Sequence, residues 1–259
     1  MYLSLNSGNS GHCSKSCELT VDQGHMLEDL IRTIVEQHGG FMKIADLSDV
    51  NVALRLKHQV YFEQFTRGIA IGIPLIRSMV NMLAYYEDPG MIYAFENHCL
   101  AQISQYLENI SLRIGLLLQE HGYKSFVMFA RGRPYKKPPH VLVANTAIGW
   151  LSGMGYIGKN GLLIHEKYGP RFRLNVVLTD APLEFVDEPI KGEGLCINCS
   201  ACVQSCPSHA IIGERFDPEN PRKKFINTER CDVYRNKRVF ELESRMCNLC
   251  QFICPAGII

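Results

Sequence analysis

The sequence predicts a mixed α/β (α+β) protein that ends in a small cysteine-rich module. Patterns typical of helices and strands alternate up to about residue 185, and such alternation indicates helices layered on a sheet. Eight of the eleven cysteines then fall between Cys196 and Cys254. With 259 residues, of which 46% are hydrophobic, the chain can form one large domain or two smaller ones with a sizeable core.

Charge and hydropathy exclude several classes of function. Lys and Arg number 27 and Asp and Glu number 26, so the net charge is +1. Such a chain has no global positive field that would gather nucleic acid or an anionic membrane. No run of about 18 apolar residues is present, so we expect no membrane span. The first residues lack the charged start and apolar segment of a secretory signal, so we expect a cytoplasmic protein.

Hydrophobic spacing places the first elements. Residues 1–24 are rich in Ser, Asn and Gly, which predicts a flexible N-terminal arm. Apolar residues between Met26 and Val35 keep helical spacing. After them the sequence predicts a buried strand, a helix and an Asp-Pro-Gly turn, at residues 67–75, 76–86 and 88–90.

The clearest helix has an apolar stripe from Leu100 to Leu118 and is closed by Gly122. We expect a strand, a basic proline-rich loop, a short helix and two strands to follow, at residues 123–130, 131–140, 145–152, 162–164 and 172–179. Prolines and acidic residues predict a linker over 182–193. The expected organisation is therefore an arm, an α/β domain and a cysteine-rich domain, at residues 1–24, 25–190 and 191–259.

The first cysteine run has the spacing of a bacterial ferredoxin-type iron–sulfur site. Cys196, Cys199 and Cys202 are separated by two residues each, and Cys206 follows after three, next to Pro207. In this arrangement three cysteines hold one [4Fe–4S] cluster and the fourth binds the other cluster of a pair. Three thiolates within seven residues can surround one cluster, after which the proline turns the chain away.

The second run is incomplete, and this suggests which cysteine completes it. Cys247, Cys250 and Cys254 keep the spacing, but Ser244 stands where a further cysteine would be. Cys231 is the spare cysteine nearby and is the natural substitute. We therefore assign cluster one to Cys196, Cys199, Cys202 and Cys254. Cluster two is assigned to Cys206, Cys231, Cys247 and Cys250.

The alternative is a pair of structural zinc sites, because Cys-x2-Cys pairs also bind zinc. Zinc sites need neither a third cysteine at equal spacing nor a repeated Cys-Pro ending, so we favour two [4Fe–4S] clusters. Fully cysteine-ligated clusters have no open iron site and conduct single electrons. We therefore expect them to exchange electrons with another reactive group.

A glycine-rich segment precedes the cysteine module, with five glycines between Gly149 and Gly161. They indicate backbone that lies close to a bulky ligand, packs tightly against the module, or forms a structural turn. Gly153, Gly155 and Gly158 have the letters of a dinucleotide-binding motif. The context is wrong for such a site, because a predicted helix precedes them and a predicted strand follows.

The segment from Ala147 to Cys254 resembles the epoxyqueuosine reductases and the respiratory reductive dehalogenases. The residues that carry this resemblance read GMGYIGKNGLLIHEKYGPRFRLNVVLTDAPLE, CINCSACVQSCPSHAI and RCDVYRNKRVF. The resemblance is weaker over residues 67–124. It includes no counterpart of the C-terminal helical-repeat domain of epoxyqueuosine reductases, so the sequence resembles a short form of the family.

The resemblance implies a nitroreductase-like, cobalamin-binding α/β domain followed by a ferredoxin-like module with two [4Fe–4S] clusters. The clusters would reduce the cobalt of a corrinoid, which would reduce a small-molecule substrate. By analogy, residues of the glycine-rich segment would contact the corrinoid, namely Gly153, Gly155, Tyr156, Ile157, Gly158, Lys159 and Asn160. Tyr156 and Lys159 are the candidate catalytic residues, as a proton donor and its electrostatic partner.

Two departures from the family affect the expected substrate. No Asp or Glu occurs from Arg131 to Ile164, in a region where epoxyqueuosine reductases carry an acidic proton donor. The sequence also lacks the twin-arginine export signal of reductive dehalogenases. We therefore rank a minimal transfer-RNA epoxyqueuosine reductase last and do not expect a nucleic acid partner. A second hypothesis is a non-catalytic electron-transfer or activator protein, which would have no deep cavity over residues 153–161 near cluster two.

Several charged residues have two possible roles. Arg171 and Arg173 could hold an anionic group or form salt bridges to acidic residues near 184–187. His209 is expected beside cluster two, where a donor to sulfur would raise the reduction potential. A basic side of the cysteine module could bind an acidic ferredoxin or flavodoxin as electron donor, through Arg222, Lys223, Lys224, Arg235, Lys237 and Arg238.

Overall fold

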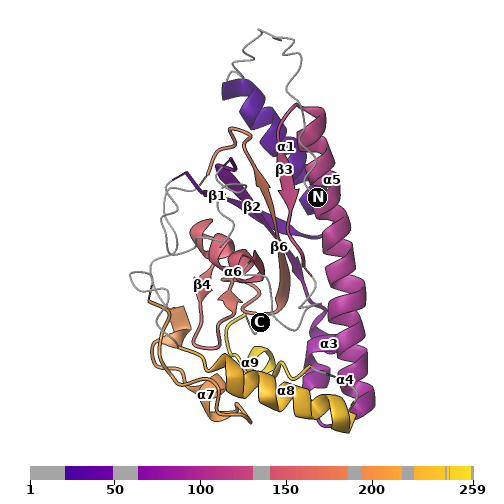
Figure 1. The fold of residues 1–259 in the computed structure, drawn as a ribbon, viewed down its shortest axis with the longest axis vertical. Coiled ribbons are helices and arrows are strands. Elements are labelled where there is room, and N and C mark those ends of the chain that lie inside the picture. Colours follow the sequence, from indigo (N-terminus) through magenta and orange to yellow (C-terminus); the bar gives the residue numbers. More distant parts are fainter. Residues whose placement is uncertain are drawn as a thin grey trace, which may run out of the picture.

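A computed structural model describes residues 21–48, 64–130, 141–185, 194–217, 225–242, 244 and 246–257. Figure 1 shows a central sheet with long helices along one side and the cysteine-rich module across its lower end. Residues 1–20 of the predicted arm and the basic loop at 131–140 lie outside the described residues. Residues 21–24 begin a helix, so the prediction of a flexible arm is wrong there. No helix in the described part of the chain is long and apolar enough to cross a membrane.

The sheet has four strands, all paired antiparallel in the order β1-β2-β6-β3. These strands are β1 (Phe41–Asp46), β2 (Arg67–Pro74), β6 (Phe172–Thr179) and β3 (Ser125–Val127). The register joins distant segments, because Ile69 of β2 lies opposite Val177 of β6. Strands β2, β3 and β6 fall where the sequence predicts strands, although β3 is much shorter than expected. Strand β1 was not predicted.

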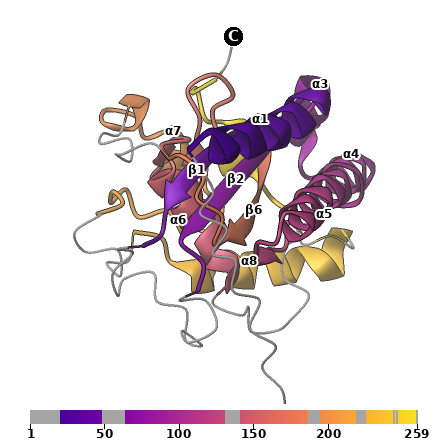
Figure 2. The same cartoon turned by 90° about the horizontal axis from the view of Figure 1, so that it is seen from above.

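Helices α1 (Val21–Gln37) and α5 (Gln105–Glu120) cover one face of the sheet (Figure 2). Their buried residues Ile31, Ile114 and Leu118 join Ile69 and Ile71 of β2 in the largest core cluster. Complete burial of one such aliphatic side chain contributes about 1.5–3 kcal/mol. The amphipathic spacing that predicted both helices therefore corresponds to this apolar interface.

Helix α6 (Val141–Leu151) and the hairpin of β4 (Tyr156–Ile157) and β5 (Leu163–Ile164) belong to the opposite layer. Ile148 of α6 packs with Val176 and Leu178 of β6. Leu163 of β5 packs with Ala70 and Phe172. The protein therefore has helices on both faces of one antiparallel sheet, and the glycine-rich segment belongs to the second layer.

A helical connection leads from β2 to α5. It contains α3 (Arg77–Asn81), η2 (Met82–Tyr85), α4 (Pro89–Glu96) and the π-helical turn η3 (Asn97–Ser104). The prediction of a turn at residues 88–90 is wrong, because helix α4 begins there. The Asp88 side chain accepts a hydrogen bond from the Met91 amide at 2.9 Å, and Pro89 occupies the first turn, where no amide donor is needed.

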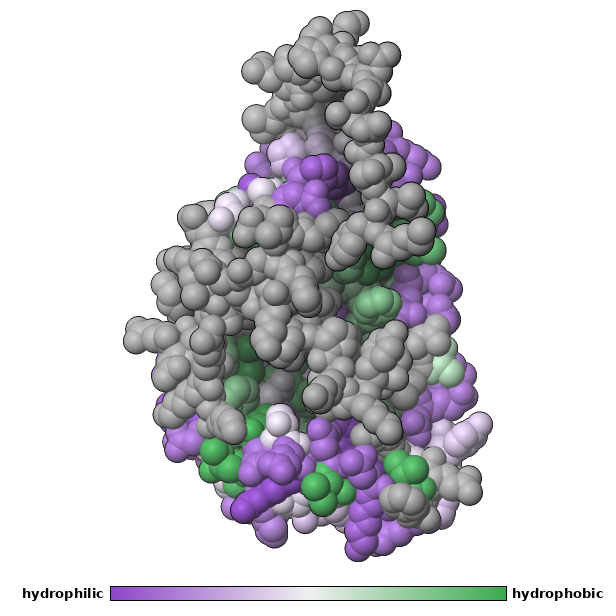
Figure 3. Space-filling model, viewed as in Figure 1, coloured by the Kyte–Doolittle hydropathy of each residue, from purple (hydrophilic) through white to green (hydrophobic). Residues whose placement is uncertain are grey.

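The cysteine-rich module contains η4 (Gly194–Cys196), α7 (Ala201–Gln204), α8 (Thr228–Leu242) and α9 (Leu249–Phe252). Met246 and Phe252 of this module pack with Leu83 and Ile92 of the helical connection. On the face shown in Figure 3, hydrophilic residues dominate the lower end and green residues are scattered among them. The module therefore shares a core with the α/β part. The division at residue 190 stays a prediction.

Candidate functional site

The eight module cysteines form two neighbouring groups according to the electrostatic influence of each thiol on the others. In the first group, burial and the surrounding thiols raise the pKa of Cys202 to about 11, the thiols being Cys196, Cys254 and Cys199. In the second group, burial raises the pKa of Cys250 far above its ordinary value, and Cys247, Cys231 and Cys206 add to this effect. Cys202 of the first group also raises the pKa of Cys250, so the two groups adjoin each other.

This arrangement fits two four-iron clusters. Thiols that repel one another as thiolates need a positive partner before all four can ionise, and iron supplies that charge. Each group draws its cysteines from distant parts of the module, as a ferredoxin-type pair requires. No three His, Cys, Asp or Glu side chains among the described residues are placed to hold a single metal ion. The ligand assignment stays a prediction that these groupings support.

Cys206 differs from Cys231, Cys247 and Cys250 because its pKa is lowered, whereas theirs are raised. The Ala210 amide donates to its Sγ at 3.3 Å, and the Ser208 hydroxyl lies 3.4 Å from the same atom. Burial raises the pKa of Cys206, but these hydrogen bonds outweigh burial and lower it. His209 was expected to be the donor, yet its side chain is exposed in a turn with positive φ.

We therefore expect Ser208→Ala to lower the reduction potential of cluster two. Loss of one weak hydrogen bond of about 0.5–1 kcal/mol corresponds to roughly 20–40 mV for a one-electron couple. A redox titration followed by electron paramagnetic resonance measures this shift. Ser200→Ala is the matched control, because Ser200 bonds the Gln204 side chain at 2.8 Å. Equal potentials for the two variants would contradict the assignment of Ser208 to the cluster-two environment.

The glycine-rich segment packs against the cysteine module. Lys159 donates to the carbonyl of Cys199 at 2.9 Å, and Asn160 donates to the carbonyl of Cys250 at 3.0 Å. Tyr156 packs with Cys254 in a small apolar cluster. Of the alternatives for this segment, tight packing against the module is therefore observed. Lys159 therefore bonds a loop that carries predicted ligands of cluster one, and Asn160 bonds a loop that carries predicted ligands of cluster two.

The glycines of the segment allow close backbone approach. A Cβ at Gly155 would lie 2.3 Å from the carbonyl oxygen of Ile164, and one at Gly158 would lie 2.8 Å from Oδ1 of Asn160. Gly153 ends α6 in a turn, where its amide bonds the carbonyl of Trp150. Ile157 packs in the apolar cluster of Leu163. Contact of these residues with a corrinoid stays a prediction.

Arg171 holds the C-terminal loop that carries Cys254. Its guanidinium donates to the carbonyls of Ala256 at 2.6 Å and Phe252 at 2.9 Å, and also to that of Cys254. Gly169 lies beside this loop with φ +55°, and a Cβ there would be 2.0 Å from the Ala256 oxygen. Arg171 therefore binds backbone carbonyls of this loop, and among the described residues it forms no salt bridge to Glu184.

The basic residues expected to bind an electron donor have different environments. Arg238 is buried and donates to the carbonyls of Met246 and Tyr86. Arg235 pairs with Asp232 at 3.9 Å. Lys237 remains exposed and lines a surface groove on α8 with Arg230. The residues from 222 to 224 lie outside the described part of the chain.

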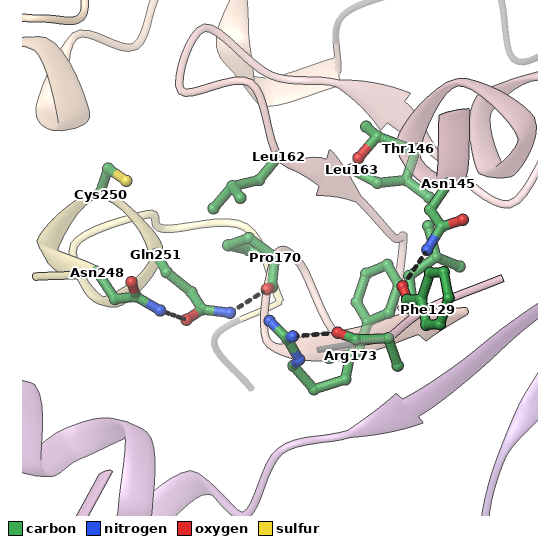
Figure 4. A pocket seen from close by; sticks show the side chains of 13 residues that line it. Phe129, Asn145, Thr146, Leu162, Leu163, Pro170, Arg173, Asn248, Cys250 and Gln251 are labelled. Carbon is green, nitrogen blue, oxygen red and sulfur yellow. Dashed lines mark hydrogen bonds between the residues drawn. The ribbon is translucent and has the colours of Figure 1, made fainter. Parts of the chain in front are cut away.

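A cavity of about 430 Å³ lies between the sheet, α6 and the α9 loop. Figure 4 shows Cys250 and Gln251 on one side of it and Asn145 on the other, with Leu162 and Arg173 between them. Its volume falls in the range of small-ligand pockets, about 300–1,000 Å³. The residues Gly153 to Asn160 are not part of its described lining. A member of the second cysteine group therefore borders the cavity.

Both the cysteine module and the larger part of the chain are similar to known proteins. Residues 195–257 match the model of a 4Fe-4S double cluster binding domain. The chain is 31% identical to an epoxyqueuosine reductase of Vibrio cholerae over 208 residues, 73% of this chain and 49% of that protein. It is also 38% identical to a tetrachloroethene reductive dehalogenase of Dehalobacter restrictus over 100 residues, 37% of this chain and 17% of that protein.

The chain is related to the iron–sulfur epoxyqueuosine reductases and reductive dehalogenases. It spans about half the length of the Vibrio relative. The fold agrees with that of solved proteins of these two kinds. An epoxyqueuosine reductase bound to a transfer-RNA stem loop has a TM-score of 0.55, 15% identity, and coverage of 90% of this chain and 64% of that chain. A catabolic reductive dehalogenase in complex with 3-bromo-4-hydroxybenzoic acid has a TM-score of 0.61 and 18% identity. The match covers 88% of this chain and 31% of that chain.

Proposed function

We propose that this chain is an iron–sulfur reductase that delivers single electrons to a group bound in the cavity beside Cys250. The observation that carries the proposal is that Cys250, an assigned ligand of cluster two, lines this cavity. Cluster one would lie farther from the cavity, because none of its four assigned ligands is among the described residues that line the cavity. Electrons would therefore pass from cluster one to cluster two and then to the cavity.

The residues around the cavity support a bound organic cofactor or substrate. Leu162, Leu163 and Phe172 form an apolar wall, and the Gln251 side chain is fixed by a 2.7 Å bond to the carbonyl of Pro170. We propose a corrinoid as the acceptor, held over Leu162 and the α9 loop at the opening of the cavity, because the cavity of about 430 Å³ is too small to enclose a whole corrinoid. It would lie in a nitroreductase-like domain beside a ferredoxin-like module. Bound there, it would supply a low-valent cobalt that reduces the substrate.

The electron-carrier alternative has less support from the structure. A protein that only passes electrons to a partner needs no internal ligand site, whereas this chain has a cavity at an assigned cluster ligand. We propose an acidic ferredoxin or flavodoxin as electron donor. Its binding surface would include Lys237 and Arg230, the exposed basic residues of the α8 groove.

Transfer RNA is a second candidate for the substrate. A family member of the same fold has been solved with a transfer-RNA stem loop, which weakens our expectation that nucleic acid is not a partner. Loss of queuosine from transfer RNA after deletion of the gene, and its return with the gene, would identify this substrate. Unchanged queuosine would favour a small molecule.

Elemental analysis tests the main proposal. The protein is purified without oxygen, incubated with cobalamin and passed through a gel-filtration column. Two four-iron clusters give about eight irons per chain, and we expect about one cobalt. About eight irons without cobalt would overturn the corrinoid and place the electron carrier first. About two metal ions, as zinc, would overturn the clusters themselves.

A further inference from the structure

Arg173 is the single charged residue among the described residues that line the cavity. Its Nε donates to the Ser104 hydroxyl at 3.0 Å, and its Nη2 donates to the carbonyl of Ala130 at 2.5 Å. Both partners are neutral. Among the described residues no carboxylate oxygen lies within 4 Å of this guanidinium. The side chain is thus fixed in place without a close ion pair, although Glu108 and Cys99 influence it electrostatically from farther away.

The rest of the guanidinium is free to bind a ligand. Its Nη1 has no hydrogen-bond partner among the described residues, and it is not an enclosed, unsatisfied atom. Figure 4 shows the group on the cavity wall, between the side chains of the α9 loop and Phe129. A guanidinium fixed through two of its nitrogens presents the third in a defined direction, which suits recognition of an anionic oxygen.

The amides around Arg173 do not offer a negative partner. Asn248 donates to Oε1 of Gln251 at 3.1 Å, and Gln251 donates to the Pro170 carbonyl. Asn145 donates to the carbonyl of Phe129 at 3.0 Å. These bonds fix a neutral polar rim around one cation, while the remaining wall is apolar. A positive charge without a close ion-pair partner in a partly enclosed cavity favours a ligand that carries a negative charge.

We propose that Arg173 binds an anionic oxygen group of the molecule in this cavity, and that this contact directs the apolar part of that molecule toward Cys250. The proposal rests on the proposed function for its assignment of the cavity. Two sources fit the chemistry, namely the carboxylate of a small substrate and the phosphate of a corrinoid's nucleotide tail. The cavity volume and its apolar wall suit a small aromatic or aliphatic carboxylate.

Two pairs of probes test the two sources of the anion. Benzoate and benzamide have nearly the same shape, but only benzoate is charged at neutral pH. Cobalamin has the tail phosphate, and cobinamide lacks the nucleotide. Binding of each probe to the iron-loaded protein is measured by calorimetry, without turnover. We expect about tenfold tighter binding of the charged member in at least one pair. The pair that discriminates identifies the source of the anion.

Arg173→Gln should abolish this discrimination and leave binding of the neutral probe within about threefold of wild type. Arg173→Lys should retain part of it. Arg113→Gln removes an exposed cation of α5 and should change nothing. Retained binding of the neutral probe, together with iron content, shows that the variant is folded. If Arg173→Gln does not fold, Arg173→Lys and the wild-type ratios alone decide the outcome.

Several results would overturn the proposal. One is equal binding of the charged and neutral probes by wild type, and another is no binding of any probe. A third is unchanged discrimination in Arg173→Gln, with a shift only in the potential of cluster two, which would make Arg173 a partner of the anionic cluster. The proposed function is tested separately, by cobalt content and electron delivery. Its failure can therefore be distinguished from the failure of this proposal.

Discussion

Cys254→Ala is expected to remove the same four irons as Cys196→Ala, although these residues lie at opposite ends of the module. Each variant should retain about four of about eight irons, and the double variant should lose no more than either single variant. The physical reason is the grouping of the thiols, since the thiols that raise the pKa of Cys254 are Cys196 and Cys199. Iron content and electron paramagnetic resonance of the reduced proteins provide the measurement.

The control for this experiment is Cys99→Ala. Cys99 is fully buried in η3, and burial raises its pKa to about 12, which keeps it a neutral thiol. The Cys99→Ala variant should therefore retain about eight irons. If Cys254→Ala and Cys196→Ala remove different clusters, so that the double variant loses all iron, the ligand assignment is wrong. A sequential assignment, with Cys206 in the cluster of Cys196, would then replace it.

Elements with a continuous apolar signal could be predicted from the sequence. Helix α5 and strand β6 bury long apolar faces, so their hydrophobic periodicity indicated both type and position. Strand β1 is short, and Phe41 and Lys43 on it are incompletely buried, so its pattern stays ambiguous without its partner β2. The start of α4 was misread as a turn because Asp-Pro-Gly favours a turn and a helix N-terminus alike.

The candidate site divides in the same way. Cysteine spacing is a local signal, so the module was predictable from the sequence alone. The cavity depends on tertiary placement, because it joins Asn145, Arg173 and Cys250 from three separated segments. The contacts of Lys159 and Asn160 are equally non-local, since each side chain reaches a carbonyl of the cysteine module. The glycines left three alternatives open, and the tertiary contacts select packing against the module.

Arg171→Met is expected to destabilise the cluster-loaded protein by about 3–5 kcal/mol, because it leaves up to three carbonyls of the Cys254 loop without their donor. Burial lowers the pKa of Arg171, yet a guanidinium stays charged near neutral pH. Its loss should also loosen the Cys254 ligand, so cluster one should release iron first. Unfolding in guanidinium chloride and the rate of iron loss to a chelator provide the two measurements.

Arg171→Lys separates charge from geometry at this position. A lysine keeps the positive charge but cannot reproduce the planar fork of donors, so we expect an intermediate loss of stability. Arg113→Met removes an exposed arginine and should shift the free energy of unfolding by less than about 0.5 kcal/mol. If Arg171→Met matches Arg113→Met in both measurements, the C-terminal loop is held by the cluster through Cys254 and not by the arginine. Preferential loss of cluster one would instead show that the α/β part positions a cluster ligand through the side chain of Arg171, which lies in the connection between β5 and β6.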